Sequence, residues 1–243
     1  LRWGEQTVVA LAGSTGSGKS SLMNALVGSD VSETGALRPT TAETLALSFG
    51  ETNAELLDWL RVRHRQAVPA GRDGLGGMVL LDLPDHDSMV SSHRTEVDRM
   101  VPVVDQLIWV LDPQKYADAA VHHGYLRPLS RHSEVMVVVL NQVDRIRAVD
   151  LDDCLKHLGQ LLDSDGLEGA PLFATSTATG AGLDALREHL ADVVAGKCAA
   201  RTRLSVELDQ LAEQFDEVCR AGPEKPGDEN IEVLEAGLAE VAG

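Results

Sequence analysis

A glycine-rich segment of eight residues has the residue types and the spacing that bind phosphate groups. It follows a short apolar run, precedes a helical pattern and has the form G-x-x-x-x-G-K-S. Glycine allows a tight turn in which successive N–H groups face phosphate oxygens, and the N-terminal end of the next helix adds positive potential. A merely flexible turn is the alternative, but the flanking strand and helix favour phosphate binding. The segment consists of Gly13, Ser14, Thr15, Gly16, Ser17, Gly18, Lys19 and Ser20.

Polar side chains at the end of this loop suit a nucleotide and its magnesium ion. Lys19 is expected to neutralise the β and γ phosphates and to assist catalysis, and the Ser20 hydroxyl is expected to bind Mg²⁺. The apolar run that ends at Leu81 leads into Asp82, an acid suited to the surroundings of the same ion. Ligands of open α/β sheets collect at such strand ends.

A second strand end carries side chains that can recognise a base. The apolar run that ends at Leu140 continues as Asn141, Gln142, Val143 and Asp144. A carboxylate such as Asp144 can accept from both the ring N–H and the exocyclic amine of guanine, whereas adenine offers no matching pair of donors. We expect guanine nucleotides, and an ATP-specific protein is the weaker alternative.

Short apolar runs alternate with segments of helical period, which is typical of an α/β fold with a mostly parallel sheet flanked by helices. Six strands are expected, at Thr7 to Ala12, Leu45 to Phe49, Met78 to Leu81, Leu107 to Leu111, Val135 to Leu140 and Leu172 to Ala174. Helices are expected over residues 19–27, 54–65, 92–104, 117–129 and 151–162. Trp59 and Trp109 lie in apolar contexts and are assigned to the core.

The order of these motifs resembles that of translation-factor-class GTPases, most like the Era and MnmE branch. Arg38 to Thr41 resembles the first switch of Era, Asp82 to Asp85 the third motif, and Thr175 to Thr177 the loop that contacts the base. The segment Asp112 to Asp118 is similar to that of a bacterial Era-like group often fused to membrane segments.

The resemblance implies a Ras-like P-loop G domain that binds GTP with Mg²⁺, hydrolyses it slowly to GDP and acts as a conformational switch. Thr41 would then bind Mg²⁺, contact the γ phosphate and take part in catalysis, with Thr40 as the alternative. Ser21, Ser176 and Thr177 would join the nucleotide-binding residues.

The sequence departs from the family pattern in the third and fourth motifs. Asp85 replaces the glycine of D-x-x-G, so its carboxylate either turns outward or the switch is arranged differently. His86 follows, and it either orients the attacking water as a catalytic residue or is a solvated loop histidine. Gln142 replaces the lysine of N-K-x-D, which affects affinity more than the preference for guanine.

Composition limits the other classes of function. The 243 residues include 38 acidic and 21 basic ones, a formal net charge of −17, which disfavours indiscriminate binding to nucleic acid. Three widely spaced cysteines fit neither a disulfide framework nor a zinc cluster, so a cytoplasmic location is expected. The longest apolar runs are far too short to span a bilayer. The chain opens without Met, which suggests a fragment, so a place at the cytoplasmic face of the inner membrane would depend on missing flanks.

Two domains are expected: a GTP-binding domain over residues 1–198 and an acidic helical extension over residues 199–243, with a linker near 222–230. An unidentified protein or a second copy of the chain is the expected macromolecular partner. Two other functions remain open, a GTP-dependent interaction module with negligible hydrolysis and a dynamin-like membrane-associated GTPase. The basic cluster Arg61, Arg63, His64 and Arg65 is interpreted as a solvated helix end, and His122 and His123 as structural.

Overall fold

The computed structural model describes residues 6–29, 31, 43–71, 74–84 and 92–220. The predictions for Thr40, Thr41, Asp85, His86 and the linker near 222–230 therefore lie outside the described residues. The chain divides into two compact units, Leu1–Cys198 and Ala199–Gly243.

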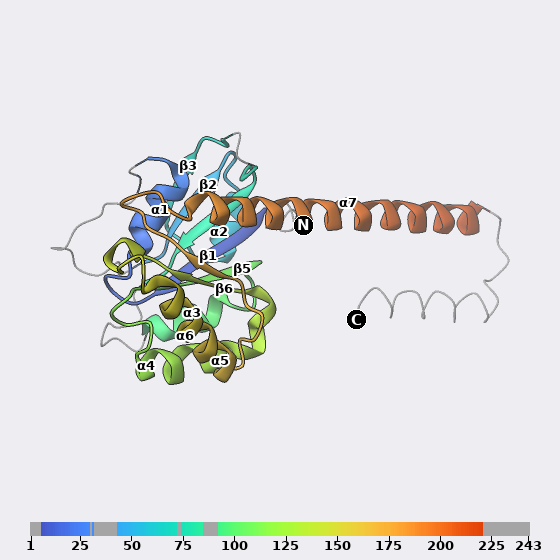
Figure 1. The fold of residues 1–243 in the computed structure, drawn as a ribbon. Coiled ribbons are helices and arrows are strands. Elements are labelled where there is room, and N and C mark those ends of the chain that lie inside the picture. The colour runs from blue at the N-terminus through green and yellow to red at the C-terminus, as the bar shows by residue number, and fades with distance from the viewer. Residues whose placement is uncertain (1–5, 30, 32–42, 72–73, 85–91, 221–243) are drawn as a thin grey trace. The chain divides into compact units, whose positions relative to one another are not determined.

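One sheet forms the centre of the first unit, with the strand order β3-β2-β4-β1-β5-β6-β7 (Figure 1). Its strands are β1 (Thr7–Gly13), β2 (Leu45–Phe49), β3 (His64–Val68), β4 (Met78–Asp82), β5 (Gln106–Leu111), β6 (Met136–Leu140) and β7 (Leu172–Ala174). All neighbouring strands pair in parallel except β2 and β4, which are antiparallel. The central strands consist largely of Val, Leu and Ala and are buried on both faces, as expected for a sheet covered by helices on each side.

Two helical layers cover the sheet (Figure 1). The core on one face is formed with α1 (Lys19–Val27) and the first turns of α7 (Leu183–Arg220). The core on the other face is formed with α2, α3, the α4 to α5 region and α6. The remaining elements are α2 (Ala54–Trp59), α3 (Ser92–Met100), α4 (Ala119–Val121), η2 (His122–Leu126), α5 (Arg127–Leu129), η3 (Ser130–Val135), η4 (Val143–Arg145) and α6 (Leu151–Ser164). The predicted α/β class is confirmed.

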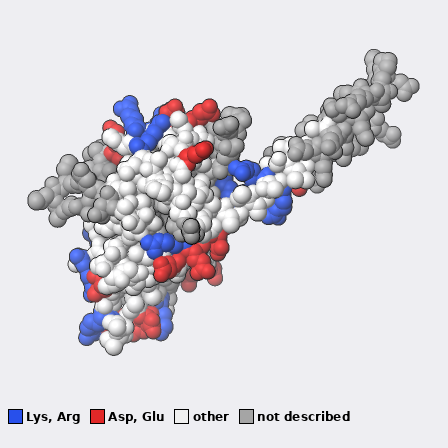
Figure 2. Space-filling view, turned by 90° about the horizontal axis from the view of Figure 1, so that it is seen from above, with Lys and Arg blue, Asp and Glu red and all other residues white. Residues whose placement is uncertain are grey.

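Charged side chains of both signs are interspersed among uncharged residues on the face shown in Figure 2. Long-range attraction of a polyanion needs a concentrated basic patch.

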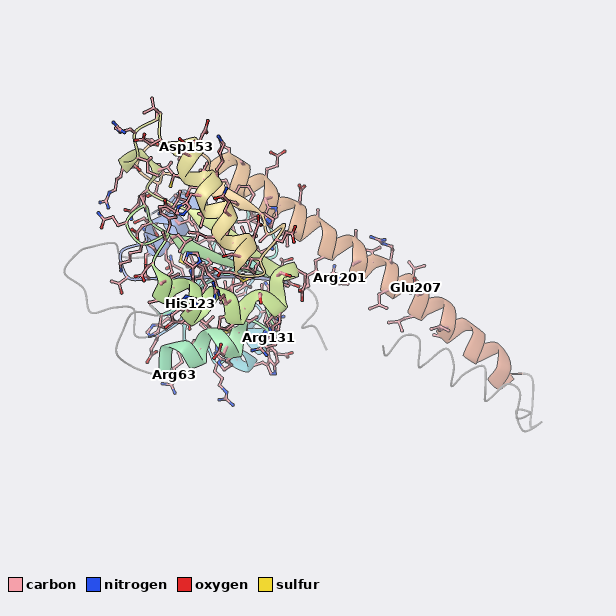
Figure 3. All side chains as sticks on the ribbon, turned by 60° about the horizontal axis from the view of Figure 1, so that its bottom comes forward. Arg63, His123, Arg131, Asp153, Arg201 and Glu207 are labelled. Carbon is pink, nitrogen blue, oxygen red and sulfur yellow. The ribbon has the colours of Figure 1, made fainter. Side chains whose placement is uncertain are left out.

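The prediction of six strands was wrong, because β3 lies where a helix was expected to continue to Arg65. Helix α2 ends at Trp59, and Arg61 has a left-handed backbone with φ 56°, which ends the helical path. Strand β3 is an edge strand whose side chains are mostly exposed, so it lacks the apolar alternation that identifies a strand in a sequence. Charged residues are common on edge strands because they discourage pairing with other chains. Arg63, just before β3, is exposed at the surface (Figure 3).

The prediction that both Trp59 and Trp109 belong to the core is half right. Trp109 on β5 is fully buried, whereas Trp59 at the end of α2 is 44% exposed. Trp109 occupies a strand covered on both faces, but Trp59 occupies the last turn of a short helix.

Two other helical segments also differ from the predicted ranges. Helix α3 ends at Met100 rather than at residue 104, and the segment expected as one helix over 117–129 is divided by the π-helical turn η2. Helix α7 continues without interruption to Arg220. None of the described helices combines the length and apolar character that a bilayer span requires.

Candidate nucleotide-binding site

Strands β1, β4, β5, β6 and β7 run in the same direction, so the loops after their carboxyl ends meet at one edge of the sheet. β1 pairs directly with both β4 and β5, and Gly13 at its end lies opposite Val110. The phosphate-loop sequence, Asp82, Asn141 and Thr175 are thereby gathered at this edge. Such an edge is where open α/β sheets bind ligands.

The carbonyl groups of the glycine-rich loop accept hydrogen bonds from side chains beside it. The buried ammonium group of Lys19 donates to the carbonyl oxygens of Gly13 at 2.8 Å and Ser14 at 3.3 Å. Asn141 Nδ2, at the end of β6, donates to the carbonyl oxygen of Ser17 at 3.0 Å.

The two carbonyls between these are also bonded. Gln142 Nε2 donates to the Gly16 carbonyl at 2.7 Å, and Lys115 Nζ donates to the Thr15 carbonyl at 3.3 Å. Each of the five successive carbonyls from residue 13 to residue 17 thus accepts from a side chain. Because these contacts fix the carbonyl directions, they also limit where the loop N–H groups can point, which suits a preformed anion site.

Gly18 is required at the junction between the loop and α1. It has φ 91°, and a Cβ placed there would lie 2.4 Å from Asn141 Nδ2. A larger residue would be strained by the left-handed backbone conformation and would displace the Asn141 side chain from the loop.

Ser20 and Asp82 come together at the mouth of the loop. Ser20 Oγ donates to Asp82 Oδ2 at 2.9 Å, and Asp82 is 1% exposed. A hydroxyl group backed by a carboxylate is a hard oxygen arrangement of the kind that Mg²⁺ prefers.

The residues predicted to recognise the base also converge. Ser176 Oγ donates to Asp144 Oδ1 at 2.5 Å, and Thr175 Oγ1 donates to Asn141 Oδ1 at 3.2 Å. Gln142 has a left-handed backbone with φ 59°, which turns the chain from β6 into η4. The two hydrogen bonds join side chains that follow β6 to side chains that follow β7.

The loop after β7 is closed by its own hydrogen bonds. The Ser176 N–H donates to the Ala181 carbonyl at 2.9 Å, and the Gly180 N–H donates to the Ser176 carbonyl at 2.9 Å. Gly182 ends the loop with φ 70°, and a Cβ there would lie only 1.9 Å from the Ala174 carbonyl oxygen. The loop can therefore close against β7 only with glycine at this position.

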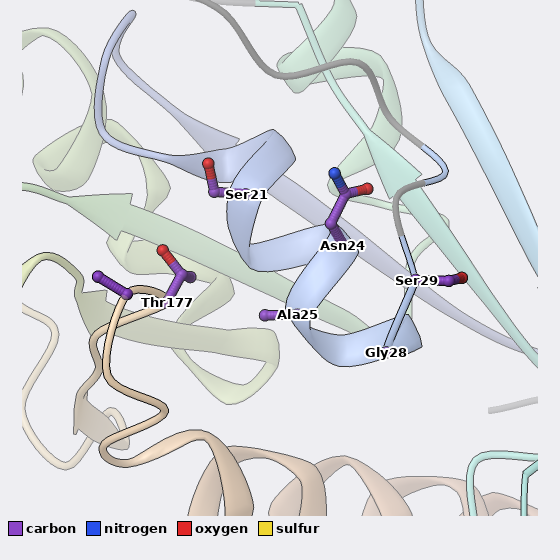
Figure 4. A pocket seen from close by; sticks show the side chains of 7 residues that line it. Ser21, Asn24, Ala25, Gly28, Ser29 and Thr177 are labelled. Carbon is purple, nitrogen blue, oxygen red and sulfur yellow. The ribbon is translucent and has the colours of Figure 1, made fainter.

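A pocket of about 480 Å³ lies between α1 and this loop (Figure 4). Ser21 and Ala25 on α1 line one side, and Thr177 and Ala178 line the other. Two predicted nucleotide-binding residues, Ser21 and Thr177, are thus placed around one space. Its volume lies within the range of small-molecule pockets.

A polar cluster joins the segment before β2 to α3. Thr44 Oγ1 donates to Glu96 Oε1 at 3.0 Å, and Arg99 Nη2 donates to the same oxygen at 2.6 Å and to the Leu60 carbonyl at 2.8 Å. Burial alone would raise the pKa of Glu96, but the hydrogen bonds and charge of Arg99, with the Thr44 hydrogen bond, outweigh it and lower the pKa.

Two residues of this site were not predicted. Lys115 reaches the loop from the turn after β5. It lies in the segment Asp112 to Asp118 noted in the sequence, but its contact with the loop depends on β5 lying next to β1. Gly182 could have been suspected from the G-A-G sequence after Thr179, but its close approach to Ala174 is a tertiary feature.

The fold and these loops together define a P-loop α/β domain, and the known proteins that resemble it are GTPases. A model of the Dynamin family matches residues 9–68, which include the glycine-rich loop. The tRNA modification GTPase MnmE of Halorhodospira halophila is 26% identical across the whole chain, and the chain covers 48% of that protein. The chain therefore spans about half the length of this curated relative.

Solved structures show the same fold. A bacterial dynamin of an oligomerised pair matches 99% of this chain with a TM-score of 0.63 and 16% identity, over 53% of its own chain. Toc33 from Arabidopsis thaliana, solved with Mg²⁺ and GMPPNP, matches 79% of this chain and 85% of its own, with a TM-score of 0.54 and 14% identity. The predicted resemblance to Era- and MnmE-like GTPases is confirmed.

Proposed function

We propose that this chain binds GTP together with Mg²⁺, hydrolyses it to GDP and phosphate, and changes conformation between the two states. The observation that carries the proposal is the loop whose five successive carbonyls are held by side chains, beside the Ser20 and Asp82 pair. Catalysis of phosphoryl transfer depends on positioning and on charge stabilisation, and both need such a preformed loop.

Guanine selectivity is assigned to Asp144. Its Oδ1 accepts from Ser176, which holds the carboxylate beside the loop after β7. The carboxylate retains further lone pairs that can accept two donors from a guanine edge. The pocket between α1 and Thr177 would accommodate the nucleoside part of the ligand.

The Ser20 hydroxyl would hold Mg²⁺, and Asp82 would orient that hydroxyl. When bound, the ion would neutralise charge on the phosphate oxygens. Lys19 would add a second positive charge beside the phosphates. Thr41 as a metal and γ-phosphate contact, and His86 as the residue that orients water, remain part of the proposal.

Calorimetry with GTP, GDP and ATP tests the ligand. We expect guanine nucleotides to bind more tightly than ATP, and Asp144→Ala to abolish that preference. Asp153→Ala is the matched control, because Asp153 lies on α6 with its side chain 85% exposed, and it should leave the preference unchanged (Figure 3). ATP binding as tight as GTP binding in the unaltered chain would contradict the assignment.

Single-turnover release of phosphate tests hydrolysis. An excess of purified protein over GTP should release phosphate faster than buffer alone, and Lys19→Ala should abolish the difference. Bound GTP that persists unhydrolysed would instead favour an interaction module that uses GTP only as a ligand.

A dynamin-like, membrane-associated GTPase is a second candidate. It is favoured by the Dynamin family match and by a bacterial dynamin structure that matches 99% of this chain. This candidate predicts that hydrolysis per molecule rises steeply with protein concentration as copies associate. A cytoplasmic location belongs to the proposal in either case and fits the free thiols of Cys154 and Cys198.

A further inference from the structure

The turn after β5, in the segment Asp112 to Asp118, supplies a lysine to the nucleotide site. Lys115 Nζ donates to the Thr15 carbonyl at 3.3 Å, next to the Gly16 carbonyl that accepts from Gln142 at 2.7 Å. The amide of Gln142 is neutral, so Lys115 brings the positive charge to this pair of neighbouring carbonyls.

The backbone of this turn is fixed at its beginning by Asp112. Asp112 Oδ1 accepts from the N–H groups of Gln114 at 2.9 Å and Lys115 at 3.2 Å. The Asp112 carbonyl also accepts from the N–H groups of Lys115 at 3.2 Å and Tyr116 at 3.0 Å. Asp112 is itself 6% exposed. The Cα of Lys115 is therefore held in one position relative to the end of β5.

The end of the turn is fixed by a buried network of polar side chains. His122 Nε2 donates to the Tyr116 carbonyl at 2.7 Å, and His122 Nδ1 contacts the carboxylate of Asp165. Asp165 is 5% exposed and also accepts from Arg127 Nε at 2.7 Å. This network of side chains couples the turn to the end of α6.

The Tyr116 side chain adds a further anchor. Its hydroxyl lies 3.1 Å from His157 Nδ1, and the two rings meet edge to face. Burial and a hydrogen bond with Cys154 raise the pKa of Tyr116, so the hydroxyl stays protonated and able to donate. A lysine on a mobile surface loop would lose backbone entropy as well as side-chain entropy in making one contact, and the anchored turn removes the backbone part of that cost.

We propose that Lys115 is a positioning residue of the nucleotide site, which holds the exposed tip of the phosphate loop and adds a positive charge beside the bound polyphosphate. The proposal rests on the proposed function, since it concerns the same site. It assigns to Lys115, on the turn after β5, the charge that Gln142 does not supply.

Affinity measurements on Lys115 variants test the proposal. The probes are GDP and a non-hydrolysable GTP analogue, each with Mg²⁺, titrated into the full chain. Lys115→Met removes the donor and the charge, and it should weaken binding by about threefold to tenfold, the range for a partly screened charged hydrogen bond. Lys115→Gln keeps a donor without charge and should lie between, and Lys115→Arg should restore binding to within about twofold.

Salt dependence separates the charge from a purely structural role. The ratio of affinities between the unaltered chain and Lys115→Met should shrink between about 0.02 M and 0.5 M salt, because screening weakens the contribution of the ammonium group. Lys156→Met is the control, since Lys156 on α6 is 74% exposed and pairs with Asp153 at 3.7 Å. It should bind as the unaltered chain does. The thermal unfolding midpoint of Lys115→Met without nucleotide should also be unchanged.

The outcomes distinguish the two proposals. If the unaltered chain and Lys115→Met bind both probes equally, the role of Lys115 is overturned while GTP binding stands. Weaker binding that Lys115→Arg does not restore, or that comes with a lower unfolding midpoint, would also overturn it. No binding by the unaltered chain would overturn the proposed function together with this inference.

Discussion

Replacing Gly182 by alanine should destabilise the domain far more than the same replacement at Gly180. Both glycines have a left-handed backbone, with φ 81° at Gly180 and φ 70° at Gly182. An added Cβ at Gly180 meets no described atom within 4 Å, whereas at Gly182 it would lie 1.9 Å from the Ala174 carbonyl oxygen. The difference between the two variants therefore isolates the close approach to β7.

The magnitudes follow from this geometry. A left-handed alanine costs about 1–2 kcal/mol, which is the expected loss for Gly180→Ala. At Gly182 the backbone must also shift by more than about 1 Å, and forced overpacking adds about 1–3 kcal/mol, giving roughly 2–5 kcal/mol in total. Gly196→Ala lies inside α7 with open space around it and should instead stabilise by about 0.5–1 kcal/mol.

Urea denaturation followed by tryptophan fluorescence gives the free energies of unfolding. Trp109 is a suitable reporter because it is buried in the centre of the sheet. Under conditions where Gly182→Ala remains folded, its affinity for GDP should also fall, because the loop that carries Ser176 and Thr177 is displaced. Equal destabilisation by Gly180→Ala and Gly182→Ala would refute the steric reasoning.

Two further predictions concern buried charge. The lowered pKa of Glu96 means that its ionised form stabilises the fold above the pKa of the unfolded chain and that this contribution is lost as the pH falls through the lower folded value. The loss in free energy of unfolding for Glu96→Gln should therefore be larger at pH 7 than near pH 4, as urea titrations at both values would reveal; a constant difference would contradict it. Replacing His122 by alanine should cost about 1–3 kcal/mol, because the buried carboxylate of Asp165 loses one hydrogen-bond partner while Arg127 remains. Thermal unfolding would measure this loss, with His123→Ala as the control. A change below about 1 kcal/mol in His122→Ala would count against a stabilising role of the buried network of His122 and Asp165.

Much of the fold could be predicted because each buried strand is a short apolar run that can be recognised in the sequence. The ranges of β2, β7 and α1 agree with the sequence expectations, and the buried strands β1, β4, β5 and β6 differ from them by one residue. An apolar run covered on both faces has few alternatives. Strand β3 could not be predicted in the same way. Its pairing with β2, rather than its apolar pattern, makes it a strand, and its charged residues resemble the end of a helix.

The sequence by itself determined the chemistry of the loop, because Gly16, Gly18, Lys19 and Ser20 are specified by local backbone and side-chain requirements. It also identified Asp144 as the candidate residue for recognition of the base. Only the tertiary structure decided which side chains support these residues. The position of β1 between β4 and β5 brings Asp82 to Ser20 on one side and Lys115 to Thr15 on the other. Strand order is set by the packing of the whole sheet, and for that reason no local pattern in the sequence could have revealed the contact of Lys115 with the loop.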